Sequence, residues 1–394
     1  MASHSFFHYW SCSSPVLVCT TFEGTERAVP ERSRATAVSP VPEMGDMVQC
    51  YSSRHMKTLN ERFSELSMRR RYEVWFLRFG LSDGSGAWWF RYLLMNLGRG
   101  GCAGDPLGQA VQVWATWFPR EGRPETWIQG FPIEKLGSSG EELDSANLES
   151  AASDKAGLRN AGLSRRGASP FFLEIAGNRI RENECRGCLE IEGQRVRWDL
   201  RYRSTFRTEL SSKGWIGFSR TPHSDATFSG EIVLNGRVFR GEPLGLGVQG
   251  HNCGYRHRDF WTWTHIHFLD ARGRGSTFEA LAYEMPLGMR SRTAVLWHDG
   301  EKFTFRKFRE AQRDSQKLKW NFECVDARGA RVEVSVCGRE GFAHRLPYVK
   351  TDCSGRFEVA NDSLALARLV LQRPGKAAEE LVTDAGAVLE MVGN

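Results

Sequence analysis

The sequence predicts an all-β protein made of two consecutive antiparallel β-barrels with few, short helices. Short runs in which apolar and polar residues alternate recur along the chain, and turn-forming residues separate them. No long amphipathic helix interrupts this pattern. The patterned region spans about 325 residues, more than one small barrel requires, so we expect two barrels.

The first 67 residues differ from the rest of the chain. They mix Ser, Thr, Pro and Arg with little apolar periodicity, so we interpret them as a disordered tail or as an extension upstream of the true start. The apolar run at 14–19 is too short for a signal-peptide core, and no basic segment precedes it. We expect residues 1–67 to add little to the packed core. Candidate starts are Met44, Met47, Met56 and Met68.

The first barrel is expected over residues 71–240. Residues 88–95 and 111–118 are dense in aromatic side chains, and residues 195–203 alternate strictly between charged and apolar positions. These patterns predict strands, the last of them with one face in water. Residues 137–169 contain no aromatic residue, Ile or Val, so we expect a loop insertion there with at most a short helix.

The second barrel is expected over residues 241–394. Just before it, Asn235-Gly236 joins two strand-like runs and supplies the positive φ angles of a tight hairpin. The segments 270–273 and 326–329 each separate two strand-like runs and are predicted turns. Residues 332–336 carry three valines at alternate positions, as in a strand with one buried face.

Composition excludes several classes of function. The net charge of +6 is spread without a basic stripe, so we expect no nucleic-acid partner. No run approaches the ~18 apolar residues of a membrane helix, so we expect no transmembrane segment and leave only peripheral membrane contact open. The ten cysteines include one close pair, Cys185 and Cys188, without the second pair that a zinc ribbon needs. We interpret most cysteines as reduced, which favours a cytoplasmic location.

A glycine triplet, Gly245-x-Gly247-x-x-Gly250, matches the dinucleotide-binding fingerprint. That fingerprint requires glycines that follow a strand and open a helix. Here they lead into residues 261–268, where β-branched and aromatic residues predict a strand. We therefore expect no bound nucleotide.

Five motifs in chain order carry a family resemblance. They are Tyr72-Glu73-Val74-Trp75, Trp88-Trp89-Phe90-Arg91-Tyr92, Phe228-Ser229-Gly230, Gly247-Val248-Gln249-Gly250-His251-Asn252-Cys253-Gly254 and Trp261-x-Trp263-x-His265. Residues 71–394 thus resemble bacterial tocopherol cyclase-like proteins, within the superfamily of carotenoid 1,2-hydratases (hydroxyneurosporene synthases) and AttH-like proteins. The resemblance implies two lipocalin-like barrels, large isoprenoid or polyketide substrates, cyclisation or hydration, and no metal or other cofactor. Cys253 departs from the family, which often has an aromatic residue there.

The strand at 261–268 has one unusually polar aromatic face. Its same-face residues are Trp261, Trp263, His265 and His267. We interpret this face as a ligand-binding barrel interior, and the alternative is a structural network of hydrogen-bonded histidines. A second alternative is a metal on the two histidines with His251 or His257 as third ligand, although no carboxylate stands beside them.

Acid chemistry at such a site needs a carboxyl group that stays protonated near neutral pH. Burial among aromatic rings raises a carboxyl pKa in that direction, and tryptophan faces stabilise a developing carbocation. Glu73 and Glu279 stand in aromatic strands, and Tyr283 shares a strand face with Glu279. The alternative is ion pairing with Arg78, Arg91 or another nearby arginine.

The predicted catalytic residues are His251, Glu279, Tyr283 and Glu73. The predicted ligand-binding residues are Gln249, Asn252, Trp261, Trp263, His265, Trp75, Arg91 and Trp114. We expect the protein to bind a large hydrophobic small molecule and to catalyse its metal-free, acid-assisted cyclisation, hydration or isomerisation. The alternative is a non-catalytic carrier of the same fold, and the oligomeric state is left open.

Overall fold

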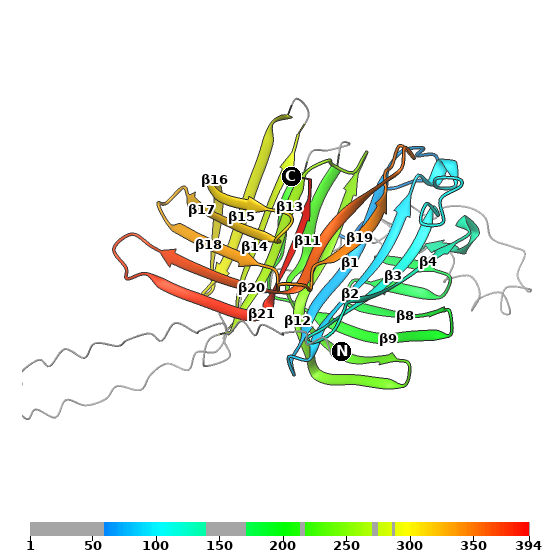
Figure 1. The fold of residues 1–394 in the computed structure, drawn as a ribbon, viewed down its shortest axis with the longest axis horizontal. Coiled ribbons are helices and arrows are strands. Elements are labelled where there is room, and N and C mark those ends of the chain that lie inside the picture. The colour runs from blue at the N-terminus through cyan, green and yellow to red at the C-terminus, as the bar shows by residue number, and fades with distance from the viewer. Residues whose placement is uncertain (1–58, 139–170, 213–216, 270–274, 286–287, 394) are drawn as a thin grey trace, which may run out of the picture. The chain divides into compact units, whose positions relative to one another are not determined.

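The computed structural model describes residues 59–138, 171–212, 217–269, 275–285 and 288–393. These residues fall within one compact unit. They are almost entirely β, and two short 3-10 turns, η1 (Leu97–Arg99) and η2 (Ile133–Lys135), accompany the strands (Figure 1). The predicted all-β class is confirmed. The predicted tail up to residue 58, most of the insertion at 137–169 and the turn at 270–273 lie outside the described residues.

Twelve antiparallel strands form the N-terminal sheet. Their order is β4-β3-β2-β1-β12-β11-β9-β8-β7-β6-β5, and β10 pairs with β11. The strands are β1 (Tyr72–Leu81), β2 (Gly86–Met95), β3 (Val111–Pro119), β4 (Glu125–Phe131), β5 (Leu136–Ser138), β6 (Phe172–Ile175), β7 (Asn178–Arg181), β8 (Glu184–Ile191), β9 (Gln194–Arg203), β10 (Thr208–Ser212), β11 (Gly217–Leu234) and β12 (Arg237–Gly254). The sheet curls around its own core but stays open in its pairing.

Nine antiparallel strands form the C-terminal barrel. Eight of them follow the order β18-β17-β16-β15-β14-β13-β21-β20, and pairing of β18 with β20 closes the ring, while β19 pairs with β20 outside it. The strands are β13 (Trp261–Leu269), β14 (Gly275–Glu284), β15 (Arg290–His298), β16 (Glu301–Asp314), β17 (Lys319–Asp326), β18 (Arg331–Cys337), β19 (His344–Val349), β20 (Arg356–Gln372) and β21 (Glu379–Val392). Two consecutive β units are therefore present, the second closed and the first a curled sheet.

The chain passes from one unit to the other later than the sequence suggests. Asn235 and Gly236 have φ angles of 49° and 87° and form the predicted hairpin between β11 and β12. β12 then continues through the expected boundary at 240/241 to Gly254, because its second half pairs with β1. We place the boundary between Gly254 and Trp261.

The glycine triplet lies inside β12 and opens no helix. A Cβ atom on Gly247 would lie 1.9 Å from the carbonyl oxygen of Arg78, and one on Gly250 would lie 2.2 Å from the ring of Phe76. These glycines therefore let β1 approach β12 closely. The fingerprint has a packing role in this strand pair.

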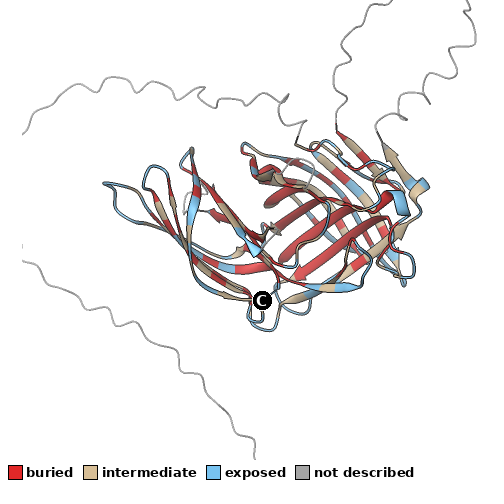
Figure 2. Ribbon diagram, turned by 90° about the horizontal axis from the view of Figure 1, so that it is seen from above, coloured by how far each residue is buried: buried red, intermediate tan, exposed pale blue. Residues whose placement is uncertain are grey.

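Three large apolar clusters organise the interior, and a small fourth one surrounds Met95, Cys102 and Val349. One fills the N-terminal sheet, where β9 buries Val196, Trp198, Leu200 and Tyr202 at the predicted alternate positions. A second fills the C-terminal barrel, and a third lies between the two units. Buried residues follow the central strands, and exposed residues collect at the hairpin ends (Figure 2).

The segment just before β1 is packed into the N-terminal sheet, which differs from the expectation for residues 1–67. The Asn60 side chain is fully buried and exchanges hydrogen bonds of 3.0 and 3.2 Å with Gln249. The backbone N–H groups of Phe63 and Ser64 donate to Glu73 at 2.7 and 2.6 Å. The carbonyl of Leu59 lies 2.6 Å from Nδ1 of His251. Residues 59–64 thus satisfy polar groups inside the sheet.

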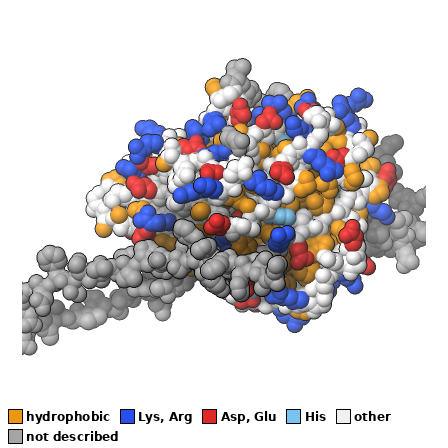
Figure 3. Space-filling view, viewed as in Figure 1, with side chains coloured by type: hydrophobic (Ala, Val, Ile, Leu, Met, Phe, Trp, Pro, Cys, Tyr) orange, Lys and Arg blue, Asp and Glu red, His pale blue; other side chains and the backbone are white. Residues whose placement is uncertain are grey.

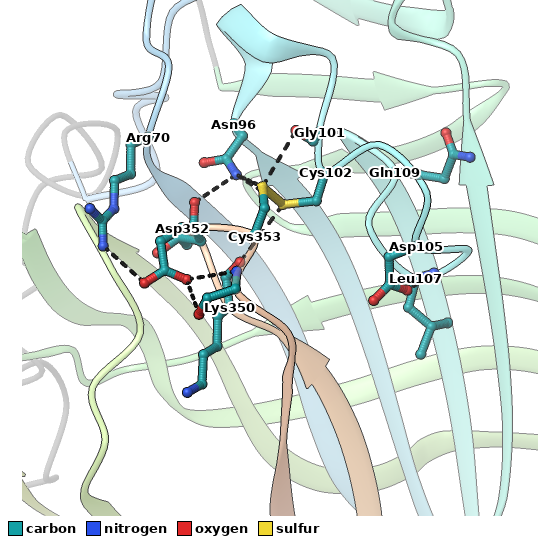
Figure 4. The surroundings of a disulfide bond; sticks show 12 residues. Arg70, Asn96, Gly101, Cys102, Asp105, Leu107, Gln109, Lys350, Asp352 and Cys353 are labelled. Atoms are coloured by element: carbon teal, nitrogen blue, oxygen red, sulfur yellow. Dashed lines mark hydrogen bonds and ion pairs between the residues drawn. A yellow bond between two sulfur atoms is a disulfide. The ribbon is translucent and has the colours of Figure 1, made fainter.

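A disulfide joins the two units. Cys102, in the loop before β3, is bonded to Cys353, in the turn between β19 and β20, 251 residues away (Figure 4). Asn96 supports the turn with a hydrogen bond of 2.8 Å to the carbonyl of Thr351. Five of the seven described cysteines are free, but the interpretation of reduced cysteines does not hold for this pair. Disulfides persist in oxidising compartments, so cysteine usage no longer supports a cytoplasmic location.

No helix in the described residues has the length and apolar character needed to span a membrane.

Two truncations test the role of residues 59–64. A chain starting at Met68 should lose on the order of 3 kcal/mol or more of unfolding free energy, because the groups that bond residues 59–64 would lose their partners. A chain starting at Met56 keeps these bonds and serves as the control. Urea unfolding of both chains measures the difference, and equal stabilities would contradict this role.

Removal of the disulfide should also lower stability. We expect the double variant C102S/C353S to lose about 2–5 kcal/mol, because the bond restricts the unfolded chain over a long loop. Thermal unfolding in the presence and absence of reductant measures the effect. A reductant-dependent shift that the double variant also shows would contradict the assignment.

Candidate functional site

A cavity lies between the N-terminal sheet and the C-terminal barrel. It encloses about 150 Å³ of free space and opens at one side. The wall formed by the sheet includes Tyr72, Val74, Phe76, Trp89, Arg91, Phe218 and Asn252. The opposite wall, formed mainly by the barrel, includes Trp261, Trp263, Leu281, Tyr283, Tyr348 and Glu390.

Strand alternation explains why these side chains meet. In β1, residues such as Phe76 face the barrel, while their neighbours face the core of the sheet. Across the ladder, Phe76 pairs with Arg91, which points the same way. In β13, Trp261 and Trp263 share one face as predicted, and the rings of Phe76 and Trp263 meet edge to face at 5.5 Å. The predicted polar aromatic face is therefore the outside of the barrel, whose interior is packed with apolar side chains.

Arg91 supplies a buried cation on the cavity wall. Its side chain is 5% exposed and lies over the rings of Trp89, Trp114 and Tyr348, with the guanidinium carbon 4.4 to 5.0 Å from each ring centre. Cation–π contacts stabilise the charge at the ring faces. The Nη1 atom of Arg91 nevertheless has no hydrogen-bond partner.

Glu390 supplies the carboxyl group of the cavity wall. It pairs across the ladder with Trp263 and therefore shares the outer face of the barrel. Burial raises the pKa of Glu390, while a 2.8 Å hydrogen bond from the Trp261 indole, the charge of Arg91 and a 3.3 Å hydrogen bond from Asn361 oppose that shift. The group therefore holds a proton more strongly than an exposed glutamate does.

Two more titratable rings complete the lining near Arg91. His257, in the link between β12 and β13, stacks on Tyr72 with ring centres 4.1 Å apart. Burial and the charge of Arg91 lower the pKa of His257 to about 3, so the ring is neutral, and its Nδ1 atom has no partner. Burial raises the pKa of Tyr72 to about 12.

Glu279 lies behind the wall and contacts the cavity through Trp263. Its Oε1 atom accepts hydrogen bonds from the Trp263 indole at 3.0 Å and from Thr221 at 2.9 Å, and its Oε2 atom has no partner. Burial raises the pKa of Glu279 to about 7, although these two hydrogen bonds lower it. Glu279 therefore fixes the orientation of Trp263.

Glu73 and His251 face the core of the N-terminal sheet instead of the cavity. The Nε2 atom of His251 lies 2.8 Å from Glu73, its Nδ1 atom lies 2.6 Å from the Leu59 carbonyl, and its ring stacks on Trp75. Burial acts to raise the pKa of Glu73, but the bonds from His251 and from the backbone outweigh burial and hold it below the usual value. A carboxylate held in this way does not act as an acid. Gln249 lies on this side too.

His265 and His267 lie between the units and bind backbone carbonyls. Their Nε2 atoms lie 2.7 Å from the carbonyl of Ser224 and 2.8 Å from that of Gly247. Burial keeps both rings neutral by lowering their pKa values. These contacts match the structural alternative, and a shared metal ion would have to break them. Among the described residues, ligand atoms converge instead at His298, Asp299 and Glu379, outside the cavity lining.

The predicted site residues thus separate into three groups. Lining residues are Arg91, Asn252, Trp261, Trp263 and Tyr283. Glu279 and Trp114 contact lining residues, and His265 lies beside Trp263 with ring centres 6.3 Å apart. Glu73, Trp75, Gln249 and His251 belong to the other face of the sheet.

The sequence reasoning missed Glu390 and Tyr348, named His257 only as an alternative metal ligand, and named Tyr72 only within a family motif. A signal for Glu390 exists, because it is the single charged residue in the apolar run 385–392. For Tyr72 the signal is its alternation with Val74 and Phe76 along β1.

The charge of the cavity lining differs from that of the face shown in Figure 3. On the face shown in Figure 3, basic and acidic side chains are interspersed, and hydrophobic side chains gather over the N-terminal sheet. Among the described residues that line the cavity, the charged ones are Arg91, Arg256 and Arg258 against Glu390. The lining is therefore aromatic with an excess of positive charge.

Comparison with solved structures supports the fold. The chain is similar to CghA, with a TM-score of 0.52 at 10% identity over 82% of this chain and 88% of that one. Kievitone hydratase from Nectria haematococca has a TM-score of 0.46 at 10% identity, over 81% of this chain and 88% of the hydratase. An AttH candidate from Nitrosomonas europaea has a TM-score of 0.43 at 11% identity, over 84% of this chain and 94% of that one. No protein-family profile and no curated protein matches the chain. The similarity to CghA shows a shared fold, in agreement with the two-unit architecture that the resemblance implied.

The raised pKa of Glu279 predicts a dependence of stability on pH. The folded protein binds this proton more tightly than the unfolded chain, so the stabilisation is complete below pH 4.5 and is lost as the pH rises through about 7. Between these values the wild-type unfolding free energy should fall relative to that of E279Q by on the order of 3 kcal/mol. Denaturant unfolding across this range, with the exposed E380Q as control, measures the difference. Parallel curves for wild type and E279Q would contradict the assignment.

Proposed function

We propose that the protein binds a large apolar small molecule, with its reacting part in the open cavity between the two units, and transfers a proton to it. The observation that supports this most directly is a cavity lined by aromatic rings that also contains a carboxyl group with a raised pKa, Glu390. Aromatic walls favour an apolar ligand, and a few placed polar groups fix its orientation. The reaction class is metal-free, acid-assisted cyclisation, hydration or isomerisation.

Glu390 is the proposed proton donor. It belongs to the cavity wall, whereas Glu279 lies behind Trp263 and acts by positioning that indole. Protonation of an olefin or enone creates positive charge on the ligand, and the faces of Trp261 and Trp263 would stabilise that charge. The carboxylate left on Glu390 would then recover a proton from the cyclised or isomerised ligand, or from the water added in hydration.

A carrier without catalysis is the second candidate. Both oxygens of Glu390 already accept hydrogen bonds, from Trp261 and Asn361, which is typical of a structural network. In a carrier, the same aromatic walls would hold the ligand and release it unchanged. The two candidates therefore differ in whether the ligand changes, while both require an apolar ligand in the cavity.

An E390Q variant should separate the two candidates. Wild type, E390Q and the control E380Q, which changes an exposed glutamate on the same strand, are each incubated with an apolar extract of the source cells. We expect wild type and E380Q to convert one compound, detected by mass spectrometry as a gain of water or as an isomer of new retention time. E390Q should reduce this rate at least about 100-fold, because it removes the proton donor.

Binding is measured on the same proteins with the neutral fluorescent probe N-phenyl-1-naphthylamine. The probe should bind to all three, because Gln fills nearly the same space as Glu. A retained compound that wild type never alters would favour the carrier. Conversion at the same rate by E390Q would contradict the assigned donor.

A further inference from the structure

We infer that the ligand carries an anionic oxygen, as a carboxylate or an acidic enol, and that Arg91 binds it. This inference rests on the proposed function, because it concerns the ligand of the same cavity. It specifies the polar head group of the ligand, which the aromatic lining alone does not define.

The hydrogen bonding of Arg91 is incomplete. Its guanidinium is buried against Trp89, Trp114 and Tyr348 and lines the cavity. Ring faces stabilise the charge but accept no strong hydrogen bond from an N–H group. The Nη1 atom has no partner, and a buried donor without a partner costs free energy. A ligand oxygen at this position would supply the missing acceptor.

The charges around Arg91 favour an anion over a neutral carbonyl group. Arg256 and Arg258 also belong to the lining, and Glu390 is its only carboxylate in the described part of the chain. No described carboxylate forms an ion pair with Arg91, although Glu390 lies close enough for the guanidinium to lower its pKa. A bound anion would neutralise this excess positive charge beside the buried guanidinium of Arg91.

Two further lining atoms without partners show how the rest of the head group fits. The Oδ1 atom of Asn252 and the Nδ1 atom of His257 both lack a hydrogen-bond partner. The Asn252 oxygen accepts a hydrogen bond, so it suits a hydroxyl or N–H group of the ligand. The ligand class is therefore an apolar body with an acidic oxygen and a neighbouring donor.

The test compares competitors that differ only in the head group. N-phenyl-1-naphthylamine reports occupancy of the cavity by fluorescence. Three competitors displace the probe from the cavity. Dodecanoate presents a carboxylate, a 2-acylcyclohexane-1,3-dione of the same chain length presents an acidic enol, and dodecanol presents a neutral hydroxyl. In wild type, at least one anionic competitor should displace the probe about 10-fold more effectively than dodecanol, because a charge-assisted hydrogen bond forms. The better of the two identifies the head group.

Variants of Arg91 tie this preference to its guanidinium. R91M should abolish the preference while the neutral probe still binds within about 2-fold, since Met keeps an apolar wall. R91K keeps the positive charge but lacks the planar guanidinium group, so it should retain part of the preference for an anionic competitor. The control R237M removes an exposed arginine that lies over Phe239 and should leave the preference intact.

The outcomes separate this inference from the proposed function. If the neutral probe does not bind to wild type, the apolar cavity itself is wrong. If the probe binds but wild type shows no preference for an anion, or if R91M keeps the preference, the role of Arg91 is wrong and the cavity stands. If R91M does not fold, as judged by circular dichroism, R91K decides: a preference for the anion that is smaller than in wild type supports the role of the Arg91 guanidinium, and an unchanged preference overturns it.

Discussion

The contact between the N-terminal sheet and the C-terminal barrel determines the site, and Arg78 is central to that contact. Its side chain leaves β1, is fully buried, and donates to the carbonyls of Ser363 and, at 2.7 Å, Ala387 in the barrel. These carbonyls lie where the ladder between β20 and β21 shifts register between Asp362 and Ala365. The irregularity frees backbone acceptors, and the arginine satisfies them. Burial lowers the pKa of Arg78 to about 9, although Asp362 raises it.

The same geometry accounts for the chemistry of the cavity. Each unit buries one face in its own core, so the aromatic residues of the opposite faces have only each other to pack against. Where this packing is incomplete, Arg91 and Glu390 line a cavity between the two units. The raised pKa of Glu390 therefore follows from its position between the two units, where burial outweighs its hydrogen bonds and the charge of Arg91.

The alternation of side chains predicts strands well, but it cannot tell which face meets which partner. For β13, the prediction that Trp261 and Trp263 share one face was correct. This face meets the N-terminal sheet and not the barrel interior. Both faces of the strand are buried, so the sequence pattern could not distinguish the two. Glu73 and His251 had the residue types of an acid site, but their neighbours, residues 59–64, could not be placed from a sequence without periodicity. The disulfide joins residues 251 positions apart, and no local pattern specifies such a pair.

The most direct measurement compares two tryptophans by probe binding and chemical denaturation. Trp263 lines the cavity, whereas Trp198 is 1% exposed in the core of the N-terminal sheet. The account predicts that Trp263→Ala weakens binding of N-phenyl-1-naphthylamine at least about 10-fold and costs less stability than Trp198→Ala, which should lose about 3–5 kcal/mol and keep its affinity. A Trp263→Ala protein that loses as much stability as Trp198→Ala and still binds the probe normally would contradict the cavity between the units.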